Sequence, residues 1–304
     1  MSRVAVLHGG ISSEREVSLV SGAACADALE RLGHTVARLD VGADVGRLVE
    51  DLADFRPDAA FNALHGRFGE DGCIQGLLNL LTLPYTHSGL TASAVAMDKP
   101  IAKSVFQTAG IPVAPHRLVD PAEAQAGDPL PRPYVIKPAQ EGSSVGVHVV
   151  LEGSDRAPLT GWSFGEQVMV EAFIPGRELT VSVMDGRPLA VTEIHTSRGF
   201  YDYDAKYAAG GSTHTVPADV PGDVAGAAMD MAVAAHDALG CRGVSRADLR
   251  WTPEKGARDG LVMLEVNTQP GMTPTSLVPE QAAHAGIEFD ALVAWMLEMA
   301  AWDC

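Results

Sequence analysis

Three oxygen-bearing side chains in the last quarter of the chain have the types and spacing of a metal site. Glu265 and Asn267 lie two residues apart in an apolar run that predicts a β-strand, so their side chains should point to the same face. Asp248 lies in the preceding predicted strand. Carboxylate and amide oxygens, with no histidine or cysteine among them, suit a hard cation such as Mg²⁺. The alternative is that Glu265 pairs with Arg246 or Arg250 and that Asn267 caps a turn.

Two glycine-containing segments could present backbone N–H groups to an anion. Gly271 follows Pro270 just after the candidate metal residues, where its N–H could bind a carboxylate or a developing oxyanion. Residues 142–146, Gly-Ser-Ser-Val-Gly, join two predicted strands and could close over phosphates, although they lack the Gly-Lys-Ser/Thr of a Walker loop. An ordinary turn and a plain hairpin are the alternatives for the two segments.

Lysines and tyrosines supply the remaining candidates for binding. Lys99 and Lys137 each end an apolar pattern beside a proline, where a lysine can contact phosphate through its charge; the alternative is a solvated surface lysine. Residues 201–207 hold three tyrosines and Lys206 within the long polar stretch 197–218. Such a stretch is typical of a lid or a binding loop, and a loop anchored by aromatic packing is the alternative.

The elements that would carry these residues begin with alternating strands and helices. Ser13 and Glu16 fit a capping box at the start of the first helix, and Pro100 fits the first turn of a later helix that ends at Gly110. The alternation predicts a parallel sheet covered on both faces. Strands are predicted at 4–7, 35–39, 59–64, 134–137, 145–151, 168–171, 179–184, 247–251 and 261–266.

Composition narrows the class of protein. The 304 residues, 46% hydrophobic and 20% charged, are ordinary for a soluble enzyme of two or three small domains. With 22 basic and 39 acidic residues, the net charge of −17 disfavours nucleic acid and anionic lipid as partners. The four cysteines form no Cys-x-x-Cys pair, which favours reduced thiols in the cytoplasm. The first apolar run is too short for a signal peptide, and no run reaches the roughly 18 residues of a membrane span.

Short motifs follow one another along nearly the whole chain. They occupy residues 9–18, 64–66, 69–72, 97–99, 141–146, 200–203, 205–207, 246–248 and 265–273. In this order and combination the sequence resembles the D-alanine–D-alanine ligases of the ATP-grasp superfamily. The resemblance implies an α/β fold of three-domain ATP-grasp architecture. Its parts would be an N-terminal domain with a Rossmann-like parallel sheet that binds the first D-alanine (1–95), a central subdomain (96–178), and a C-terminal subdomain with the metal site and the lid (179–304).

The resemblance also implies a reaction. ATP would drive the ligation of two D-alanines to D-alanyl-D-alanine through a D-alanyl phosphate, with ADP and phosphate as products, for peptidoglycan precursor synthesis. A pair of Mg²⁺ ions, or Mn²⁺ in their place, would be held by Asp248, Glu265 and Asn267. A cytoplasmic homodimer is implied as well. The rivals are another ATP-grasp carboxylate–amine ligase, including the D-lactate-forming type, and a catalytically silent ATP-binding regulator.

Roles for individual residues follow from the same resemblance. Glu14 would bind the ammonium group of the first D-alanine, with His65 nearby, and Ser276 with Lys206 would bind the carboxylate of the second. The oxyanion would be stabilised by Arg246 and the Gly271 N–H. The nucleotide would contact Lys99, Lys137, Ser143, Ser144, Glu171, Glu178 and Lys206.

A triad of Glu14, Ser143 and Tyr207 would connect the lid to the first domain and help to deprotonate the incoming amine. Relatives that form D-alanyl-D-lactate differ at the position of Tyr207, so this tyrosine favours an amine over a hydroxyl nucleophile.

Overall fold

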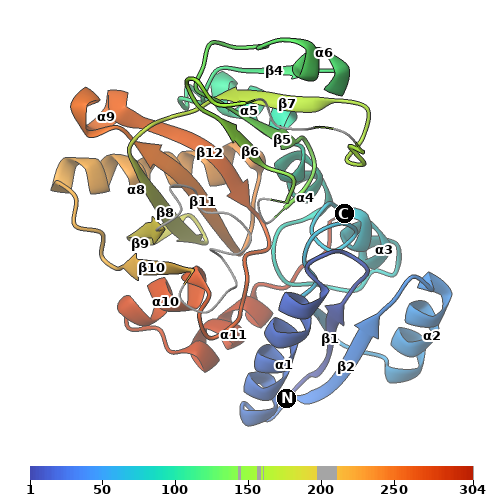
Figure 1. Cartoon of the computed structure of the whole chain (residues 1–304). Helices are drawn as coiled ribbons and strands as arrows, with labels where there is room; N and C mark the ends of the chain where they lie inside the picture. The colour runs from blue at the N-terminus through green and yellow to red at the C-terminus, as the bar shows by residue number, and fades with distance from the viewer. Residues whose placement is uncertain (143–144, 156–158, 160, 197–210, 304) are drawn as a thin grey trace.

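The N-terminal part of the chain folds around a three-stranded parallel sheet. In the computed structural model, which describes residues 1–142, 145–155, 159, 161–196 and 211–303, strand β1 (Arg3–Gly9) is central. It lies between β2 (Thr35–Val41), which is seen beside it in Figure 1, and β3 (Ala59–Asn62), and both pairings are parallel.

Both faces of this sheet are covered by helices. Alternate residues of β1 point to opposite faces. Val4 and Val6 pack in one core with α1 (Arg15–Arg31) and α11 (Phe289–Glu298). Ala5 and Leu7 pack in another with α2 (Val45–Phe55) and α3 (Cys73–Leu80). The prediction of a parallel sheet covered on both faces is therefore confirmed, and the last helix of the chain completes the N-terminal core.

The predicted capping box at the start of α1 is wrong. The helix begins at Arg15, after Glu14 in the capping position, and no side chain caps it. The Ser12 hydroxyl instead donates to the carbonyl oxygen of His65 at 2.7 Å and accepts from the Glu14 N–H at 3.2 Å. The polar residues before α1 therefore connect the helix to the loop that follows β3, rather than cap its first turn.

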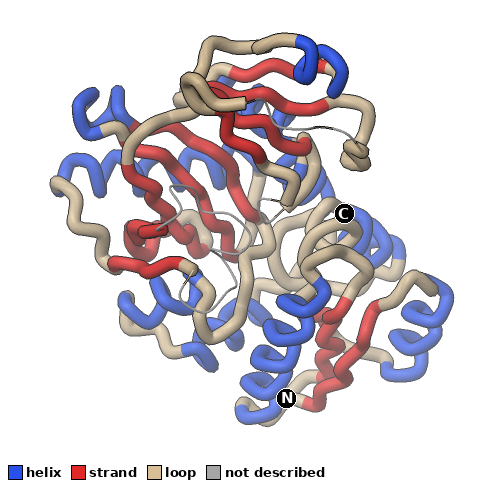
Figure 2. The backbone as a smooth tube through the Cα atoms, in the orientation of Figure 1, coloured by secondary structure: helices blue, strands red, loops and turns tan. Residues whose placement is uncertain are grey.

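Two antiparallel sheets make up the rest of the molecule (Figures 1 and 2). The smaller has the order β4-β7-β5-β6 and carries α6 (Pro121–Ala126). The larger has the order β10-β9-β8-β11-β12. The strands of the smaller sheet are β4 (His116–Val119), β5 (Tyr134–Pro138), β6 (His148–Val150) and β7 (Val168–Ala172). Those of the larger are β8 (Arg177–Met184), β9 (Arg187–Thr196), β10 (Ser212–Thr215), β11 (Val244–Trp251) and β12 (Leu261–Asn267).

The largest group of helices packs against the larger sheet through one hydrophobic core. Its buried residues come from β8, β11 and β12 and from the helices α4 (Leu90–Met97), α5 (Lys99–Thr108) and α8 (Gly222–Leu239). Asp98 caps α5 by accepting from the Ile101 N–H at 3.1 Å, and Pro100 lies in the first turn as predicted. The remaining elements are the short helices η1 (Pro253–Lys255) and α9 (Ala257–Gly260), and α10 (Leu277–His284).

Strand β9 had not been predicted, although the sequence carries a signal for it. Asp185 and Gly186, both with positive φ (50° and 73°), form the tight turn between β8 and β9. An Asp-Gly pair before alternating apolar residues is a strong hairpin signal. The helices α4 and α10 and strand β10 were also missed, and β10 falls within the range 197–218 that we expected to be a lid without regular structure.

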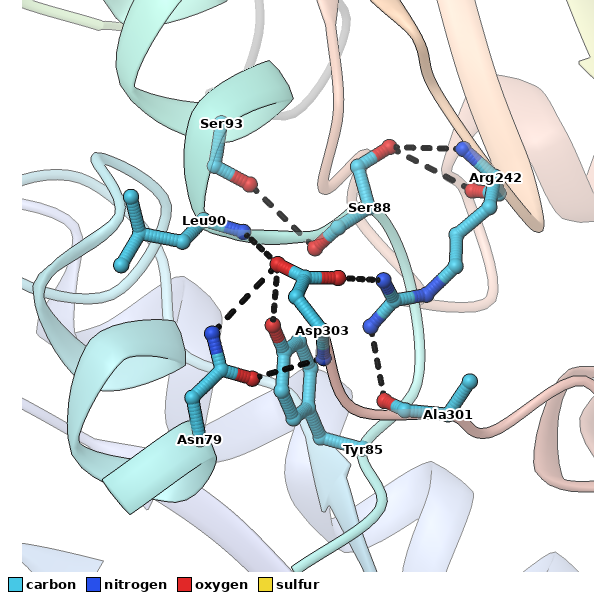
Figure 3. A network of polar contacts seen from close by, with 8 residues as sticks. All are labelled: Asn79, Tyr85, Ser88, Leu90, Ser93, Arg242, Ala301 and Asp303. Carbon is cyan, nitrogen blue, oxygen red and sulfur yellow. Dashed lines mark hydrogen bonds and ion pairs between the residues drawn. The ribbon is translucent and has the colours of Figure 1, made fainter. Parts of the chain in front are cut away.

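The C-terminal tail joins the first and last parts of the chain through a polar network (Figure 3). One carboxylate oxygen of Asp303, Oδ2, accepts from the Leu90 N–H at 2.8 Å, from the Tyr85 hydroxyl at 3.3 Å and from the Asn79 amide at 3.4 Å. Its Oδ1 accepts from Arg242, which also donates to the Ala301 carbonyl oxygen at 2.7 Å. The tail thereby fixes the start of α4, the helix that leads to Lys99.

The helices and the cysteines bear on the compartment expected from the sequence. Among the residues that the structure describes, no helix combines the length and the apolar character that a membrane span requires. The described cysteines Cys25, Cys73 and Cys241 are free thiols.

Candidate active site

The predicted metal residues share one face of the larger sheet. In the antiparallel pair β11–β12, Asp248 lies opposite Glu265 and Arg246 lies opposite Asn267. Directly opposite residues of such a pair point to the same side, as do residues two apart on one strand. The structure therefore brings together the three oxygen donors that the strand spacing predicted, and adds Arg246 to them.

The ion pairs at this face differ from the ones we considered. Arg246 binds Asp248, not Glu265, with Nε–Oδ1 and Nη2–Oδ2 distances of 2.9 and 2.8 Å. The two residues lie two apart on one strand, and this spacing sets the contact. Asp248 Oδ1 also accepts from the Thr180 hydroxyl at 2.7 Å. Each oxygen of this buried carboxylate thus has a donor.

The partner of Glu265 is a lysine. Its Oε2 lies 3.4 Å from Lys99 Nζ, so the alternative of an arginine partner is wrong. Asn267 does cap a turn, because its Oδ1 accepts from the Gln269 N–H at 3.1 Å. These contacts leave the residues compatible with a cation, since carboxylate and amide oxygens on one face are the donor set of a hard metal. No group of three or more His, Cys, Asp or Glu side chains with metal-binding geometry occurs in the described part of the chain.

One cavity, which we call the Glu171 cavity, lies between the two antiparallel sheets. It is lined by Lys137, Glu171, Glu178, Asp248 and Arg250, with apolar walls from Val135, Ala172, Phe173, Ile174 and Leu264. Lys137 Nζ donates to Glu171 Oε2 at 2.6 Å. Arg250 Nη1 donates to Glu178 Oε2 at 3.1 Å. An apolar slot with a charged rim is suited to a flat base that carries polar groups at its edge.

A second cavity, which we call the Glu14 cavity, lies between the N-terminal domain and the larger sheet. Glu14, His65, Arg246, Gly271 and Ser276 all line it. These are the predicted substrate residues, apart from Lys206. Side chains from both ends of the sequence therefore meet around one space, as the resemblance implied.

Glu14 shares its end of this cavity with a second acid that sequence reasoning did not select. Glu70 is buried, and both burial and the nearby Glu14 raise the pKa of its carboxyl well above the ordinary value. Gly142 packs against the pair: a Cβ there would lie 2.8 Å from Glu14 Oε2 and 3.3 Å from Glu70 Oε1. Only a glycine lets the loop approach so closely. Glu70 could have been selected from the sequence, because it lies within the motif at residues 69–72.

His65 lies beside Glu14 in the Glu14 cavity. Its Nε2 is 3.2 Å from the Ser21 hydroxyl oxygen, which also accepts from the Met272 N–H at 3.3 Å. Burial lowers the pKa of His65, so its ring is neutral near pH 7. Ser21 thus connects the histidine to the backbone next to Gly271.

The loop after β12 is held against the N-terminal domain by a buried amide. Gln269 Oε1 accepts from Asn62 Nδ2 at 2.6 Å, and Gln269 Nε2 donates to the Leu64 carbonyl oxygen. Two residues further on, a Cβ at Gly271 would lie 2.8 Å from Ser276 Oγ, so a side chain would clash there. Ser276 precedes α10, and its hydroxyl accepts from the Thr273 N–H at 3.0 Å rather than capping the helix.

Lys99 lies where the two cavities meet. The cavities share Lys99, Glu141 and Glu265 in their linings. Lys99 Nζ donates to the Glu141 carbonyl oxygen at 2.6 Å, and the Lys99 N–H donates to the Ala139 carbonyl oxygen at 3.1 Å. The start of α5 is thereby joined to the loop that leads into residues 143 and 144.

Four predicted residues cannot be located. Ser143, Ser144, Lys206 and Tyr207 lie outside the described residues, so their roles remain predictions. Every other predicted nucleotide residue lines the Glu171 cavity or lies where the cavities meet.

Comparison with known proteins agrees with this arrangement. The family model described as "D-ala D-ala ligase C-terminus" matches residues 105–298, and the one described as "D-ala D-ala ligase N-terminus" matches residues 47–88. The D-alanine–D-alanine ligase of Acidiphilium cryptum is 60% identical over 303 residues, and that of Rhodospirillum rubrum is 59% identical over 303 residues. Each alignment covers 99% of both chains.

Solved structures are similar over the same length. The D-alanine–D-alanine ligase of Bacillus anthracis in complex with ATP superimposes with a TM-score of 0.82 at 28% identity, covering 98% of this chain and 97% of its own. The D-Ala:D-Ser ligase of Enterococcus faecalis gives a TM-score of 0.80 at 27% identity, covering 98% of both chains. By sequence and by fold, the chain belongs to the D-alanine–D-alanine ligase family.

Proposed function

We propose that this protein uses ATP to join two D-alanine molecules into D-alanyl-D-alanine, a precursor of peptidoglycan. One observation carries the proposal. The Glu171 cavity, with its apolar walls and charged rim, meets the Glu14 cavity at Lys99 and Glu265, which line both. Such a junction is where a nucleotide in one cavity could transfer its γ-phosphoryl group to a carboxylate in the other.

The nucleotide would occupy the Glu171 cavity. Phe173 and Ile174 would cover the base, Glu171 would accept from its exocyclic amino group, and Glu178 would accept from the ribose hydroxyls. Lys137 and Lys99 would neutralise the phosphates. The sequence also assigns Ser143, Ser144 and Lys206 to the phosphates.

Asp248, Glu265 and Asn267 would hold Mg²⁺, with Mn²⁺ as a substitute. The fit is supported by three oxygen donors on one sheet face, Asp248 opposite Glu265, at the wall where the cavities meet. Once bound, the cations would neutralise part of the charge on the phosphates. Arg246 and Lys99, which pair with two of these carboxylates in the structure, would then be released to face the substrates.

In the first step, a carboxylate oxygen of the first D-alanine attacks the γ-phosphorus. The new P–O bond replaces the one to ADP, and D-alanyl phosphate results. Glu14 would fix the ammonium group of this D-alanine, with neutral His65 beside it. Because two anions must approach each other, the lysine charges are the main contribution of the chain to this step.

In the second step, the amine of the second D-alanine attacks the carbonyl carbon, loses a proton, and phosphate leaves. Arg246 and the Gly271 N–H would stabilise the oxyanion. Ser276 and Lys206 would bind the carboxylate of this D-alanine, supported by the N-terminus of α10 that follows Ser276. Through its link to Glu14 and Ser143, Tyr207 would close a lid that keeps water from the acyl phosphate.

Domain roles, assembly and compartment complete the proposal. Residues 1–95 would bind the first D-alanine, 96–178 and 179–304 would enclose the nucleotide, and residues at about 197–218 would form the lid. A homodimer is supported by the exposed apolar residues Leu80 (85% exposed) and Leu81 on and beside α3. The free cysteines are compatible with the cytoplasm.

One assay tests the activity. Purified protein is mixed with ATP and Mg²⁺ and with D-alanine, L-alanine, D-serine or D-lactate, and both phosphate and the condensation product are measured. We expect D-alanyl-D-alanine and one phosphate per dipeptide with D-alanine alone. Phosphate release that does not depend on a D-amino acid would contradict the proposal, and a mixed product with D-serine or D-lactate would correct the second substrate.

A further inference from the structure

A lysine outside both cavities is completely buried behind the proposed base site. Lys103 lies on α5, and its side chain is 0% exposed. The chain has only five lysines, against seventeen arginines. Three of the five, Lys99, Lys103 and Lys137, lie in or beside the two cavities. An ammonium group in the protein interior is costly unless it is paired. The position therefore requires an explanation.

The partner of Lys103 is Glu171. Lys103 Nζ lies 2.5 Å from Glu171 Oε1 and 3.5 Å from the Met263 carbonyl oxygen. The short distance makes the contact between Lys103 and Oε1 a close, charge-assisted ion pair. The other oxygen, Oε2, receives the hydrogen bond from Lys137 at 2.6 Å.

Charge in this cluster is uneven, with two lysines around one carboxylate. Burial lowers the pKa of the Lys103 ammonium, and Glu171 opposes this effect. Burial would raise the pKa of the Glu171 carboxyl, but Lys137 and Lys103 bring it below its ordinary value. Glu171 is therefore ionised, and it depends on both cations to remain so.

The two lysines differ in what they can reach. Lys137 lines the Glu171 cavity, whereas Lys103 is not part of its lining. An ATP phosphate can draw Lys137 away from Glu171, but Lys103 is enclosed among α5, β7 and β12 and must stay. We infer that Lys103 is a positioning residue that keeps Glu171 ionised and in place while Lys137 is transferred to the phosphates. The inference rests on the nucleotide roles proposed above for Lys137 and Glu171.

A consequence for base selection follows. An ionised carboxylate accepts from the amino group of adenine but opposes the carbonyl oxygen that guanine presents at the same edge. Without Lys103, Lys137 is the only cation among the described residues that still contacts Glu171, so the carboxylate would retain it and the phosphates would lose a contact. Lys103 thus supports both the affinity for ATP and the preference for adenine.

The test is Lys103→Met, which keeps the length of the side chain and removes its charge. We expect KM for ATP to rise about tenfold, the size of effect typical of one charge-assisted contact. KM for D-alanine should stay within about twofold, and the ratio of kcat/KM for ATP over GTP should fall. Lys255→Met, the same change at an exposed position on η1, is the matched control and should alter none of these values.

A double-mutant cycle shows whether Lys103 acts through Glu171. In a Glu171→Gln background, Lys103→Met should raise KM for ATP no further. Lys103→Gln, which retains a donor in the core, replaces Lys103→Met if that variant does not fold. The inference is overturned if the Lys103 change lowers the melting temperature but leaves both KM for ATP and the ATP:GTP ratio unchanged, or if it raises KM equally in both backgrounds.

Failure of the proposed nucleotide site would look different. If Lys137→Met and Glu171→Gln bind ATP as tightly as the unaltered protein in calorimetry, the site itself is misplaced, whatever Lys103→Met does. If those two variants lose affinity and Lys103→Met does not, the role of Lys103 alone is refuted.

Discussion

Replacing Asp303 by alanine should destabilise the whole chain, although the residue lies next to its end. The carboxylate meets the first N–H of α4 at Leu90, where no side chain from the helix itself serves as a cap (Figure 3). It also pairs with Arg242 and accepts from Tyr85 and Asn79. Alanine removes all four contacts at once and leaves the Arg242 guanidinium with the Ala301 carbonyl oxygen and the face of the Tyr85 ring.

The size of the effect can be worked out contact by contact. Loss of a helix cap costs about 1 kcal/mol. The Asp303 side chain is 37% exposed, so solvent screening reduces the ion pair with Arg242 to about 1 kcal/mol. The two longer contacts, to Tyr85 and Asn79, add about 0.5 kcal/mol together. A total of about 2.5 kcal/mol corresponds to a fall in melting temperature of about 4 °C for a chain of this length.

Asp290→Ala is the matched control for this measurement. Asp290 is also 37% exposed and also pairs with an arginine, Arg31, but no backbone N–H or tyrosine hydroxyl of the described residues donates to its carboxylate. Its loss should lower the melting temperature by no more than about 2 °C. Melting temperature is measured by calorimetry and the free energy of unfolding by urea titration. Equal decreases for the two variants would refute the conclusion that Asp303 caps α4 and holds Arg242, Tyr85 and Asn79 in place.

The same carboxylate gives the sign of a pH effect. Its contacts with Leu90, Arg242 and Asn79 outweigh burial and lower the pKa of Asp303 below the ordinary 3.8. A lowered pKa in the folded state means that the stabilisation is present above 3.8 and is lost as the pH falls through the folded-state value. The difference between Asp303→Ala and the unaltered protein should therefore close in strong acid.

Three more predictions concern the site. Glu265→Gln should lower kcat by about 100-fold or more and raise the Mg²⁺ concentration needed for half-maximal activity, because a proposed carboxylate ligand becomes a neutral amide. Asp259→Asn, the same kind of change at an exposed position, is the control. Normal turnover of Glu265→Gln at limiting Mg²⁺ would refute the metal site. Tyr207→Phe should leave ATP binding nearly intact while admitting more water to the acyl phosphate, seen as phosphate release without dipeptide; a collapse of ATP affinity would place Tyr207 in the nucleotide site instead. Glu70→Gln should stabilise the free protein increasingly as the pH rises, because the raised pKa of Glu70 confines its favourable contribution to low pH; parallel melting curves from pH 4 to 9 would show that Glu70 titrates normally.

The sequence predicted well wherever a short periodic pattern decides the structure. The short apolar run from Val4 to Leu7 predicted β1, and the alternation of strands with helices predicted a sheet covered on both faces, which fits the two cores that β1 enters. The two-residue period of a strand placed Glu265 and Asn267 on one face. That inference needs only the geometry of one strand, which is the same in every protein.

Partners across the fold could not be predicted in that way. The resemblance located Glu171 and Lys137, but no pattern in the sequence indicates that Lys103 lies against Glu171, because α5 and β7 are brought together only by the tertiary structure. The helical spacing from Lys99 to Lys103 places both on one side of α5 and was the available signal.

Four acids proposed to bind the nucleotide or the metal each hold a cationic side chain before any ligand arrives. The pairs are Lys99–Glu265, Arg246–Asp248, Lys137–Glu171 and Arg250–Glu178. ATP and the proposed metal would bring both signs of charge, so the phosphates would attract the lysines while Asp248 and Glu265 would gain the metal as a partner. At Asp248 and Glu265 such an exchange would leave each carboxylate with a charged partner, whereas an unpaired buried charge would cost several kcal/mol. Glu171 is the exception, because it receives an uncharged amino group in return for Lys137, and it is the one acid of the set with a second, enclosed lysine behind it.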